Sequence, residues 1–397
     1  MSNNIFSVAY QDSNVKSEII DGEEYEVIVI CDKYDEEESL DDIKSEVAND
    51  DVSNFRDLFY VDIPLRSFSF NWSMYKLQGR DVAKLYEVVD MKKSARVYNC
   101  ATYLEFIECT ENETHRHVVR GNFCEDRFCP ICSHRRSTVL ALQTKHMLEK
   151  YLQQNNNCSL VFLTLTQKNV SHLSLKQEID NVLNAWTKLT KKKEFRAKIR
   201  EWTRVLEITV NNDTKELHPH VHAILVVNSN YFSDVIKQYQ WVAMWRECLG
   251  IDYNPVVYVQ RVIARGKSAN VSVGASVSAV VSKYISKYMS KSVFELLLSN
   301  DGVDTKQYFK SLVDGLRGRR LITYSRGLSS LLHDVKLETD QQAKEFIESV
   351  KQDEIYCINC GARAVYSIYK YDNENEKYIL VRSKINGNLQ APDAPSP

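Results

Sequence analysis

Apolar residues between positions 130 and 300 switch repeatedly between helical spacing and the alternation of a half-buried strand. The segment NNDTKELHP (211–219) separates two alternating runs and indicates a β-hairpin. The predicted elements are, in chain order, a helix over 134–153, a strand over 159–167, a helix over 174–200, strands over 204–210 and 220–227, a helix over about 233–248, a strand over 256–262 and a helix over 278–298.

The order strand, helix, strand, strand, helix, strand favours an α+β domain with an antiparallel sheet of the ferredoxin-like kind. A doubly wound nucleotide-binding fold is disfavoured, because the chain contains neither a G-x-G-x-x-G nor a G-x-x-x-x-G-K-[ST] segment. The GKS at 266–268 lacks the upstream glycine of a phosphate loop, so no ATP-driven motor is indicated.

Composition and charge divide the chain further. Apolar residues make up 44% and charged residues 26% of the 397 residues, and no apolar run reaches the length of a membrane helix. Residues 1–55 carry 16 Asp and Glu against 3 Lys, a balance of −13, so the rest carries +11 within a net charge of −2. An acidic leader followed by a basic remainder is typical of a protein that binds a polyanion. The alternative is an acidic, solvated tail next to a protein surface of ordinary charge. No secretory signal is evident, and a cytoplasmic location is expected.

Four regions are predicted from these patterns. The acidic leader is expected to be largely disordered, apart from a possible strand in EYEVIVICDKY (24–34). A cysteine-rich segment with its following helix precedes the α+β domain, and a mixed C-terminal region ends in a disordered tail. The regions are residues 1–55, 56–155, 156–300 and 301–397.

The segment LHPHVHAILVV (217–227) places histidines at every second position of a predicted strand. His220 and His222 therefore share one face of that strand. If Val210 pairs with Leu217, Glu207 lies opposite His220 and completes a set of two histidines and one carboxylate. This combination suits a divalent metal ion, whereas a hydrogen-bonded polar pair on a half-exposed strand is the alternative.

The predicted helix over 278–298 carries two tyrosines four residues apart, Tyr284 and Tyr288. They share a helix face, and a row of lysines at positions 283, 287 and 291 runs beside them. A neighbouring ammonium group favours the nucleophilic phenolate form of tyrosine. A buried aromatic pair is the alternative, although a lysine row argues against full burial.

Cysteines cluster at the start of the predicted helix over 134–153. Cys124, Cys129 and Cys132 have the spacing of thiolate ligands to zinc. The fourth ligand is left open by the spacing, and the candidates are Cys100, Cys109, His115, His117 and His134. The later pair Cys357 and Cys360 resembles half of a zinc ribbon, with no evident second half.

Three segments in one order, FLTLTQ (162–167), HPHVHAILV (218–226) and KYISKYMSK (283–291), resemble the motifs of HUH-type rolling-circle replication initiators. The segments RVYNCATYLEF (96–106) and NFCEDRFCPICSHRRS (122–137) are similar to the cysteine-rich part of the plasmid Rep family of Gram-positive type. The resemblance extends over about residues 95–330, and its specificity rests on the order of several segments.

The resemblance implies a metal-dependent DNA strand transferase. Glu207, His220 and His222 are expected to hold the catalytic metal, Mg²⁺ or Mn²⁺, and Cys100 becomes the expected fourth ligand of a structural zinc. A tyrosine, Tyr284 or Tyr288 with Lys287 beside it, is expected to nick single-stranded origin DNA, leaving a 5′-phosphotyrosine link and a 3′-OH primer. The strand is later rejoined without ATP. The expected partners are plasmid or phage origin DNA and the host helicase and polymerase.

One departure keeps other functions open. Plasmid initiators of this type carry E-x-x-K-Y, but the glutamate is missing here. Tyr284 takes its place if the motif ends at Tyr288, and Val280 takes it if the motif ends at Tyr284. The two-tyrosine form resembles the initiators of single-stranded phages. A two-tyrosine transposase would share these motifs. A catalytically silent, zinc-stabilised DNA-binding regulator is also compatible with the missing glutamate. The three histidines also resemble those of the histidine-triad nucleotide hydrolases, which need neither the tyrosines nor the cysteines.

Basic residues near these motifs are candidates for contacts with DNA phosphates, which supply affinity more than sequence readout. A solvated helix face is the alternative for the lysines. The candidates are Arg135, Arg136, Lys192, Arg196, Lys283 and Lys291.

Overall fold

The computed structural model describes the backbone of residues 15–20, 23–28, 71–112, 115–211, 213–262, 297, 304–350, 355–357, 360–385 and 388–390. The strands β1 (Val15–Ile20) and β2 (Glu23–Ile28) form an antiparallel hairpin in the acidic leader. β2 overlaps the strand predicted there. In the part of the chain so described, no helix combines the length and the apolar character needed to cross a membrane.

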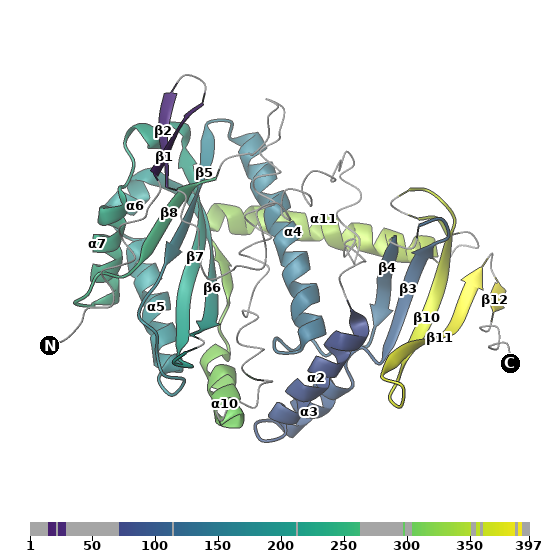
Figure 1. The fold of residues 1–397 in the computed structure, drawn as a ribbon. Coiled ribbons are helices and arrows are strands. Elements are labelled where there is room, and N and C mark those ends of the chain that lie inside the picture. The colour runs from purple at the N-terminus through teal and green to yellow at the C-terminus, as the bar shows by residue number, and fades with distance from the viewer. Residues whose placement is uncertain are drawn as a thin grey trace.

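One five-stranded antiparallel sheet, called the central sheet below, has the order β8-β5-β7-β6-β9 and lies on the left in Figure 1. The strands are β5 (Cys158–Leu165), β6 (Ile199–Val210), β7 (Leu217–Asn228), β8 (Val257–Arg261) and β9 (Ile322–Tyr324). Along the chain, α5 (Leu175–Leu189) and α6 (Lys193–Lys198) lie between β5 and β6. The short 3₁₀ helix η3 (Ser229–Ser233) and α7 (Gln238–Leu249) lie between β7 and β8. The predicted order strand, helix, strand, strand, helix, strand and the α+β class with an antiparallel sheet are confirmed.

The predicted helix over 174–200 is wrong in its second half. α5 ends at Leu189, the short α6 follows, and β6 begins at Ile199, five residues before the predicted start. β6 begins early because of its pairing with β7. β7 continues to Asn228, and the buried backbone groups at its end need hydrogen-bonding partners, which Ile199 to Thr203 supply by pairing with Val227 to Ile224. Pairing with a neighbouring strand thus overrides the helical spacing of the sequence.

The two faces of the central sheet are covered by different helices. On one face Val161, Leu163 and Leu165 of β5 belong to the core that also contains the apolar faces of α5 and α7. On the other face Leu160 and Phe162 pack in a cluster with residues of α4 (Pro130–Gln154) and α11 (Arg326–Val350) (Figure 1). Strand alternation therefore decides which helices each functional side chain meets.

A second antiparallel sheet has the order β12-β11-β10-β3-β4. Its strands are β3 (Tyr103–Cys109), β4 (Arg116–Gly121), β10 (Ala364–Asp372), β11 (Lys377–Ile385) and β12 (Asn388–Gln390). β10 pairs with β3 so that Ala364 lies opposite Cys109. The sheet thus joins the cysteine-rich segment to the C-terminal region, while β9 joins that region to the central sheet. The predicted domain boundaries stay a prediction, and the hydrogen-bonded sheets extend across them.

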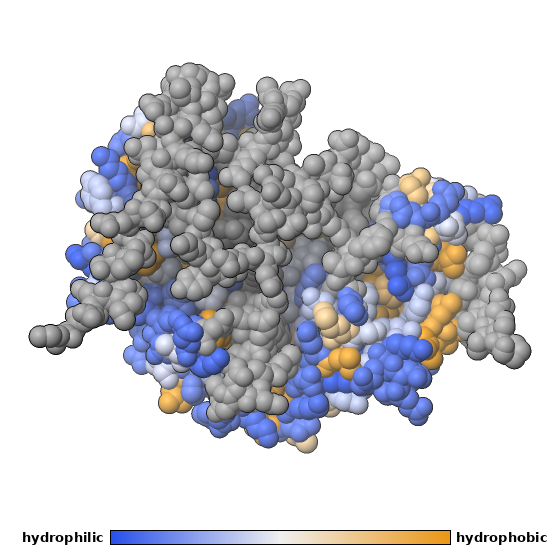
Figure 2. All heavy atoms as spheres, viewed as in Figure 1, coloured by the Kyte–Doolittle hydropathy of each residue, from blue (hydrophilic) through white to orange (hydrophobic). Residues whose placement is uncertain are grey.

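Three further helices are α2 (Trp72–Tyr86), α3 (Met91–Tyr98) and α10 (Thr305–Leu316). α2 packs against α4, and α3 and α10 both contact α2. Asn71 and Asp90 cap the N-termini of α2 and α3 by accepting backbone N–H groups of the first turn. Tyr86 packs edge-on against Phe128 and Phe309, which ties α2 to the segment before α4 and to α10. On the face in Figure 2, hydrophilic side chains predominate around these helices, with only scattered hydrophobic ones.

Candidate functional site

The register of the β6–β7 hairpin brings the predicted metal ligands together. Val210 pairs with Leu217, Glu207 with His220 and Val205 with His222, as the sequence predicted. The connecting turn fixes this register through the side-chain carbonyl of Asn211, which accepts the backbone N–H groups of Asp213 and Thr214. A slip of one residue would turn Glu207 to the opposite face. All three candidate ligands instead lie on the face covered by α4 and α11.

The three ligand atoms lie almost equally far apart. Oε2 of Glu207 is 3.2 Å from His220 Nε2 and 2.9 Å from His222 Nε2, and the two nitrogens are 3.1 Å apart. Three mutually perpendicular ligands, each ~2.1 Å from an octahedral ion, are separated by ~3.0 Å. All three side chains are buried. Their chemistry and spacing therefore fit one triangular face of an octahedral divalent ion.

Hydrogen bonds behind the two imidazoles turn both Nε2 atoms toward the carboxylate of Glu207, which is the arrangement that a shared metal ion requires. His220 Nδ1 lies 3.0 Å from the carbonyl oxygen of His218, so it donates its proton there. His222 Nδ1 lies 2.9 Å from the hydroxyl oxygen of Thr164, the residue paired with it on β5. When His222 binds a metal through Nε2, that hydroxyl accepts the Nδ1 proton. The sequence had singled out the segment around Thr164, but the role of this side chain comes only from the strand pairing.

The electrostatics of the cluster favour a charged carboxylate. Burial alone would raise the pKa of Glu207, but hydrogen bonds and charge interactions with His220 and His222 lower it well below its usual range. His218 is different, because burial lowers its pKa to about 4 and leaves it neutral at pH 7. Its ring lies beside His220 at a centroid distance of 5.1 Å, yet it does not belong to the group of converging ligand atoms.

Four cysteines converge at the start of α4. Cys100 follows α3, Cys124 follows β4, Cys129 precedes α4 and Cys132 lies in its first turn, and all four are buried. Cys132 Sγ lies 3.5 Å from Cys100 Sγ and 3.6 Å from Cys124 Sγ. A tetrahedral zinc with Zn–S bonds of ~2.3 Å separates its sulfurs by ~3.8 Å. The four residues thus fit a closed site without a place for substrate, and Cys100 is the fourth member that the resemblance predicted.

The surroundings of this cysteine group suit thiolates. The backbone N–H groups of Cys124 and Glu125 donate to the sulfurs of Cys100 and Cys132 at 3.4 Å and 3.3 Å. The neighbouring cysteines lower the pKa of Cys132 well below its usual range and, together with burial, raise those of Cys124 and Cys129 well above theirs. The four thiols thus compete for one negative charge, and a bound metal would stabilise the others as thiolates. The buried ammonium of Lys76 donates to the carbonyl oxygen of Cys100 at 2.6 Å and so holds this part of the chain in place.

A second group contains residues that the sequence had offered as alternatives for the first. Cys109 and His115 lie beside Cys357 and Cys360, the pair for which no partner was evident in the sequence. His117 and His134 belong to neither group. Because the two halves of this second group are about 250 residues apart, no local spacing could have joined them.

Two of the predicted phosphate contacts, the arginines at the start of α4, make contacts within the protein. The guanidinium of Arg135 stacks on Phe123 at 3.4 Å from the ring centre, and Arg136 donates to the carbonyl oxygen of Glu125 at 2.6 Å. Both lie next to the cysteine group. Their contact with DNA stays a prediction.

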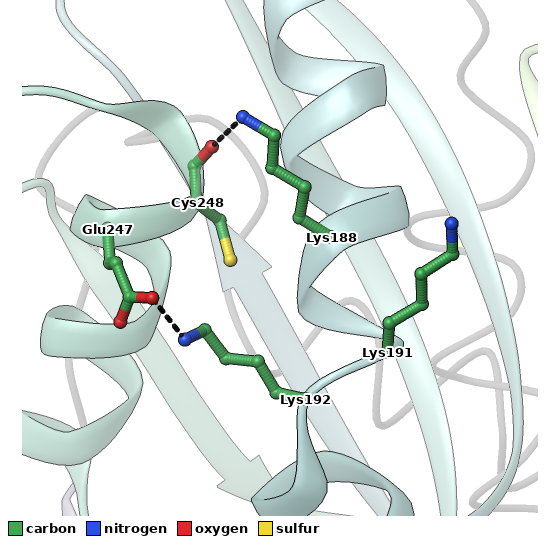
Figure 3. A pocket seen from close by; sticks show the side chains of 5 residues that line it. All are labelled: Lys188, Lys191, Lys192, Glu247 and Cys248. Atoms are coloured by element: carbon green, nitrogen blue, oxygen red, sulfur yellow. Dashed lines mark hydrogen bonds and ion pairs between the residues drawn. The ribbon is translucent and has the colours of Figure 1, made fainter.

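The basic stretch at α5 and α6 lies in the helix layer on the sheet face opposite the histidines (Figure 1). Lys192 forms an ion pair with Glu247 at 2.7 Å, and Lys188 donates to the carbonyl oxygen of Cys248 at 3.4 Å. The side chain of Lys191 points away from Glu247 and Cys248 (Figure 3). Nearby, Arg196 donates to the carbonyl oxygen of Thr190 at 3.4 Å. Any contact of these side chains with DNA would therefore be remote from the candidate metal ligands.

The predicted tyrosine helix lies outside the described residues. This applies to Tyr284 and Tyr288 and to the lysines at 283, 287 and 291. Of the predicted helix over 278–298, Leu297 alone is described, as a buried helical residue.

Comparison with known proteins identifies the family. A family model described as "Replication protein" matches residues 115–379, which include the three candidate metal ligands and both candidate tyrosines. This chain belongs to the Rep family of plasmid replication proteins. No solved structure matches this Rep protein significantly.

Several similar proteins carry the name "Protein rep". A "Protein rep" of Lentilactobacillus hilgardii is 29% identical over 77% of this chain and 93% of its own length. A "Protein rep" of Lactiplantibacillus plantarum is 29% identical over 78% and 95%. A "Protein rep" of Bacillus amyloliquefaciens is 34% identical over 50% of this chain, and the matched part spans 60% of that relative.

Proposed function

We propose that this Rep protein is a replication initiator of the HUH class, which nicks one strand of origin DNA and later rejoins it. The observation that carries the proposal is the set of three buried ligand atoms 2.9–3.2 Å apart on one sheet face, in a member of a replication-protein family. The order β8-β5-β7-β6 supports a ferredoxin-like fold, because in the order of the chain these are strands four, one, three and two.

The proposed reaction exchanges one phosphodiester for another. The phenolate oxygen of Tyr284 or Tyr288 attacks the scissile phosphorus, a P–O(Tyr) bond forms, and the P–O3′ bond breaks. The 5′-phosphate stays on the tyrosine, and the released 3′-OH primes synthesis. Lys287 favours the phenolate by its positive charge. The reverse attack by a 3′-OH rejoins the strand, so the bond energy is conserved and no ATP is needed.

Glu207, His220 and His222 would hold the divalent ion, with Thr164 and the carbonyl of His218 orienting the two imidazoles. Mg²⁺ or Mn²⁺ bound there would supply Lewis-acid stabilisation of charge on the phosphate. The cysteines at positions 100, 124, 129 and 132 would hold a structural zinc, because all four positions are filled by protein.

The proposed setting is the cytoplasm, with origin DNA as substrate and the host helicase and polymerase as partners. Tyr284 at the position of the usual glutamate favours a mechanism in which two tyrosines exchange the strand. A transposase of the two-tyrosine class would use the same residues and differs in its DNA substrate.

The test is a covalent adduct. Full-length protein is incubated with single-stranded DNA from its own replicon and Mn²⁺, and the products are separated on a denaturing gel. Wild type is expected to form a protein–DNA adduct, the two single Tyr→Phe variants to differ from each other, and Tyr284→Phe/Tyr288→Phe to form none. An adduct with the double variant would place the nucleophile elsewhere. No adduct with any DNA from wild type would favour the catalytically silent regulator.

A further inference from the structure

Four potential metal ligands converge at one end of the second sheet, away from both sites described above. Cys109 is the last residue of β3 and His115 directly precedes β4, so both belong to one hairpin. Cys357 and Cys360 lie in a turn before β10. One ligand atom from each lies within 4.8 Å of the others. We propose that these four residues form a second structural zinc site, which fastens the C-terminal strands to the cysteine-rich segment.

The distances match tetrahedral zinc coordination. Cys109 Sγ lies 3.6 Å from Cys360 Sγ, and Cys357 Sγ lies 3.6 Å from His115 Nδ1. Tetrahedral zinc separates two thiolate sulfurs by ~3.8 Å and a sulfur from an imidazole nitrogen by ~3.6 Å. A disulfide requires sulfurs ~2.05 Å apart, so the spacing of Cys109 and Cys360 favours a shared metal.

The backbone on both sides is shaped to present these ligands. In the turn after Cys357, the N–H of Gly361 donates to the carbonyl oxygen of Cys357 at 2.8 Å, and the N–H of Cys357 donates to that of Ala362 at 2.7 Å. Gly361 has a φ of +73°, in the left-handed region that glycine adopts without strain. On the other side, the N–H of Cys109 donates to the carbonyl oxygen of His115 at 2.9 Å, which closes the β3–β4 turn.

A metal at this position would have a clear structural task. The local core is a small cluster of Ile107, Cys109, Ile355, Cys357 and Ala364, separate from the two larger cores. So few apolar side chains bury little surface, and small cores commonly need a metal or a disulfide. Cys109 and Cys360 are 251 positions apart, and fixing the ends of a long loop removes much chain entropy from the unfolded state. The zinc would hold the hairpin of β10 and β11 against β3.

The first test counts zinc. Full-length wild type, Cys357→Ser/Cys360→Ser and Cys158→Ser are purified without chelators and analysed for zinc per chain. Cys158 is the matched control, because it is a partly buried thiol of the central sheet outside both groups. The double variant is expected to hold one zinc fewer than wild type, and Cys158→Ser the same number as wild type. Equal zinc contents in wild type and double variant would overturn the proposal, as would a Cys109–Cys360 disulfide in the mass spectrum of the unreduced protein.

A second measurement covers the case in which the double variant does not fold. His115→Cys keeps four ligands, so its zinc content is expected to equal that of wild type. In the cobalt-substituted chain this variant should show stronger thiolate-to-cobalt charge-transfer absorption than wild type. An unchanged cobalt spectrum would exclude His115 as a ligand. Neither result depends on the nicking activity, so the second zinc site and the proposed function can fail separately.

Discussion

Replacing Thr164 by valine tests how the central sheet supports the candidate catalytic metal. The Thr164 hydroxyl lies 2.9 Å from His222 Nδ1 and is buried, so valine keeps the shape of the side chain but leaves that proton without this acceptor. Outer partners of metal-binding histidines contribute about 10–100-fold to metal affinity. We therefore expect the dissociation constant for Mn²⁺ to rise by about 10–100-fold, which corresponds to about 1.4–2.7 kcal/mol.

Thr166→Val is the matched control. Thr166 is equally buried two positions along the chain, and its hydroxyl donates to the carbonyl oxygen of Val256 at 2.9 Å rather than to a histidine. Each substitution removes one buried hydrogen bond, at a cost of about 1 kcal/mol in the free energy of unfolding. Both variants are thus expected to lose similar thermal stability, whereas only Thr164→Val loses Mn²⁺ affinity.

The assay is a titration of Mn²⁺ into full-length protein, in which binding is measured by isothermal calorimetry or by the electron paramagnetic resonance of the free Mn²⁺. Thr164→Ser keeps the hydroxyl and is expected to restore most of the affinity. If Thr164→Val binds Mn²⁺ as tightly as Thr166→Val and wild type, the hydroxyl does not orient His222 and the reasoning is wrong.

Three further outcomes follow from the same structure. His222→Ala is expected to abolish nicking while DNA binding stays largely intact, because basic residues supply the affinity for DNA. Equal nicking by wild type and variant at limiting Mn²⁺ would contradict the role of His222 as a metal ligand. A strong zinc chelator should lower the melting temperature, because it removes the zinc from the site that contains Cys129. A weak chelator that removes only Mg²⁺ or Mn²⁺ should stop nicking and leave the fold intact. Finding no zinc in protein that was purified without chelators would refute this prediction. Deleting residues 1–55, which carry −13, should tighten non-specific DNA binding and steepen its salt dependence without changing cleavage, and superimposable binding curves at low salt would exclude competition by the leader.

The sequence by itself determined those parts of the site whose residues are close along the chain. Glu207 and His220 are 13 positions apart in one hairpin, so strand alternation and a short turn are enough to place them opposite each other. The thiols of Cys124, Cys129 and Cys132 are likewise gathered by local spacing. The element order, and with it the α+β class with an antiparallel sheet, also follows from local periodicity.

The tertiary structure alone decided the features that depend on contacts distant in sequence. Thr164 reaches His222 across 58 positions because β5 pairs with β7, and Cys109 reaches Cys360 across 251 because β10 pairs with β3. The early start of β6 at Ile199 has the same origin, since the backbone of β7 demands a partner there. Strand pairing between distant segments is selected by the burial and hydrogen bonding of the whole sheet, and no local pattern in the sequence records which distant strand that partner is.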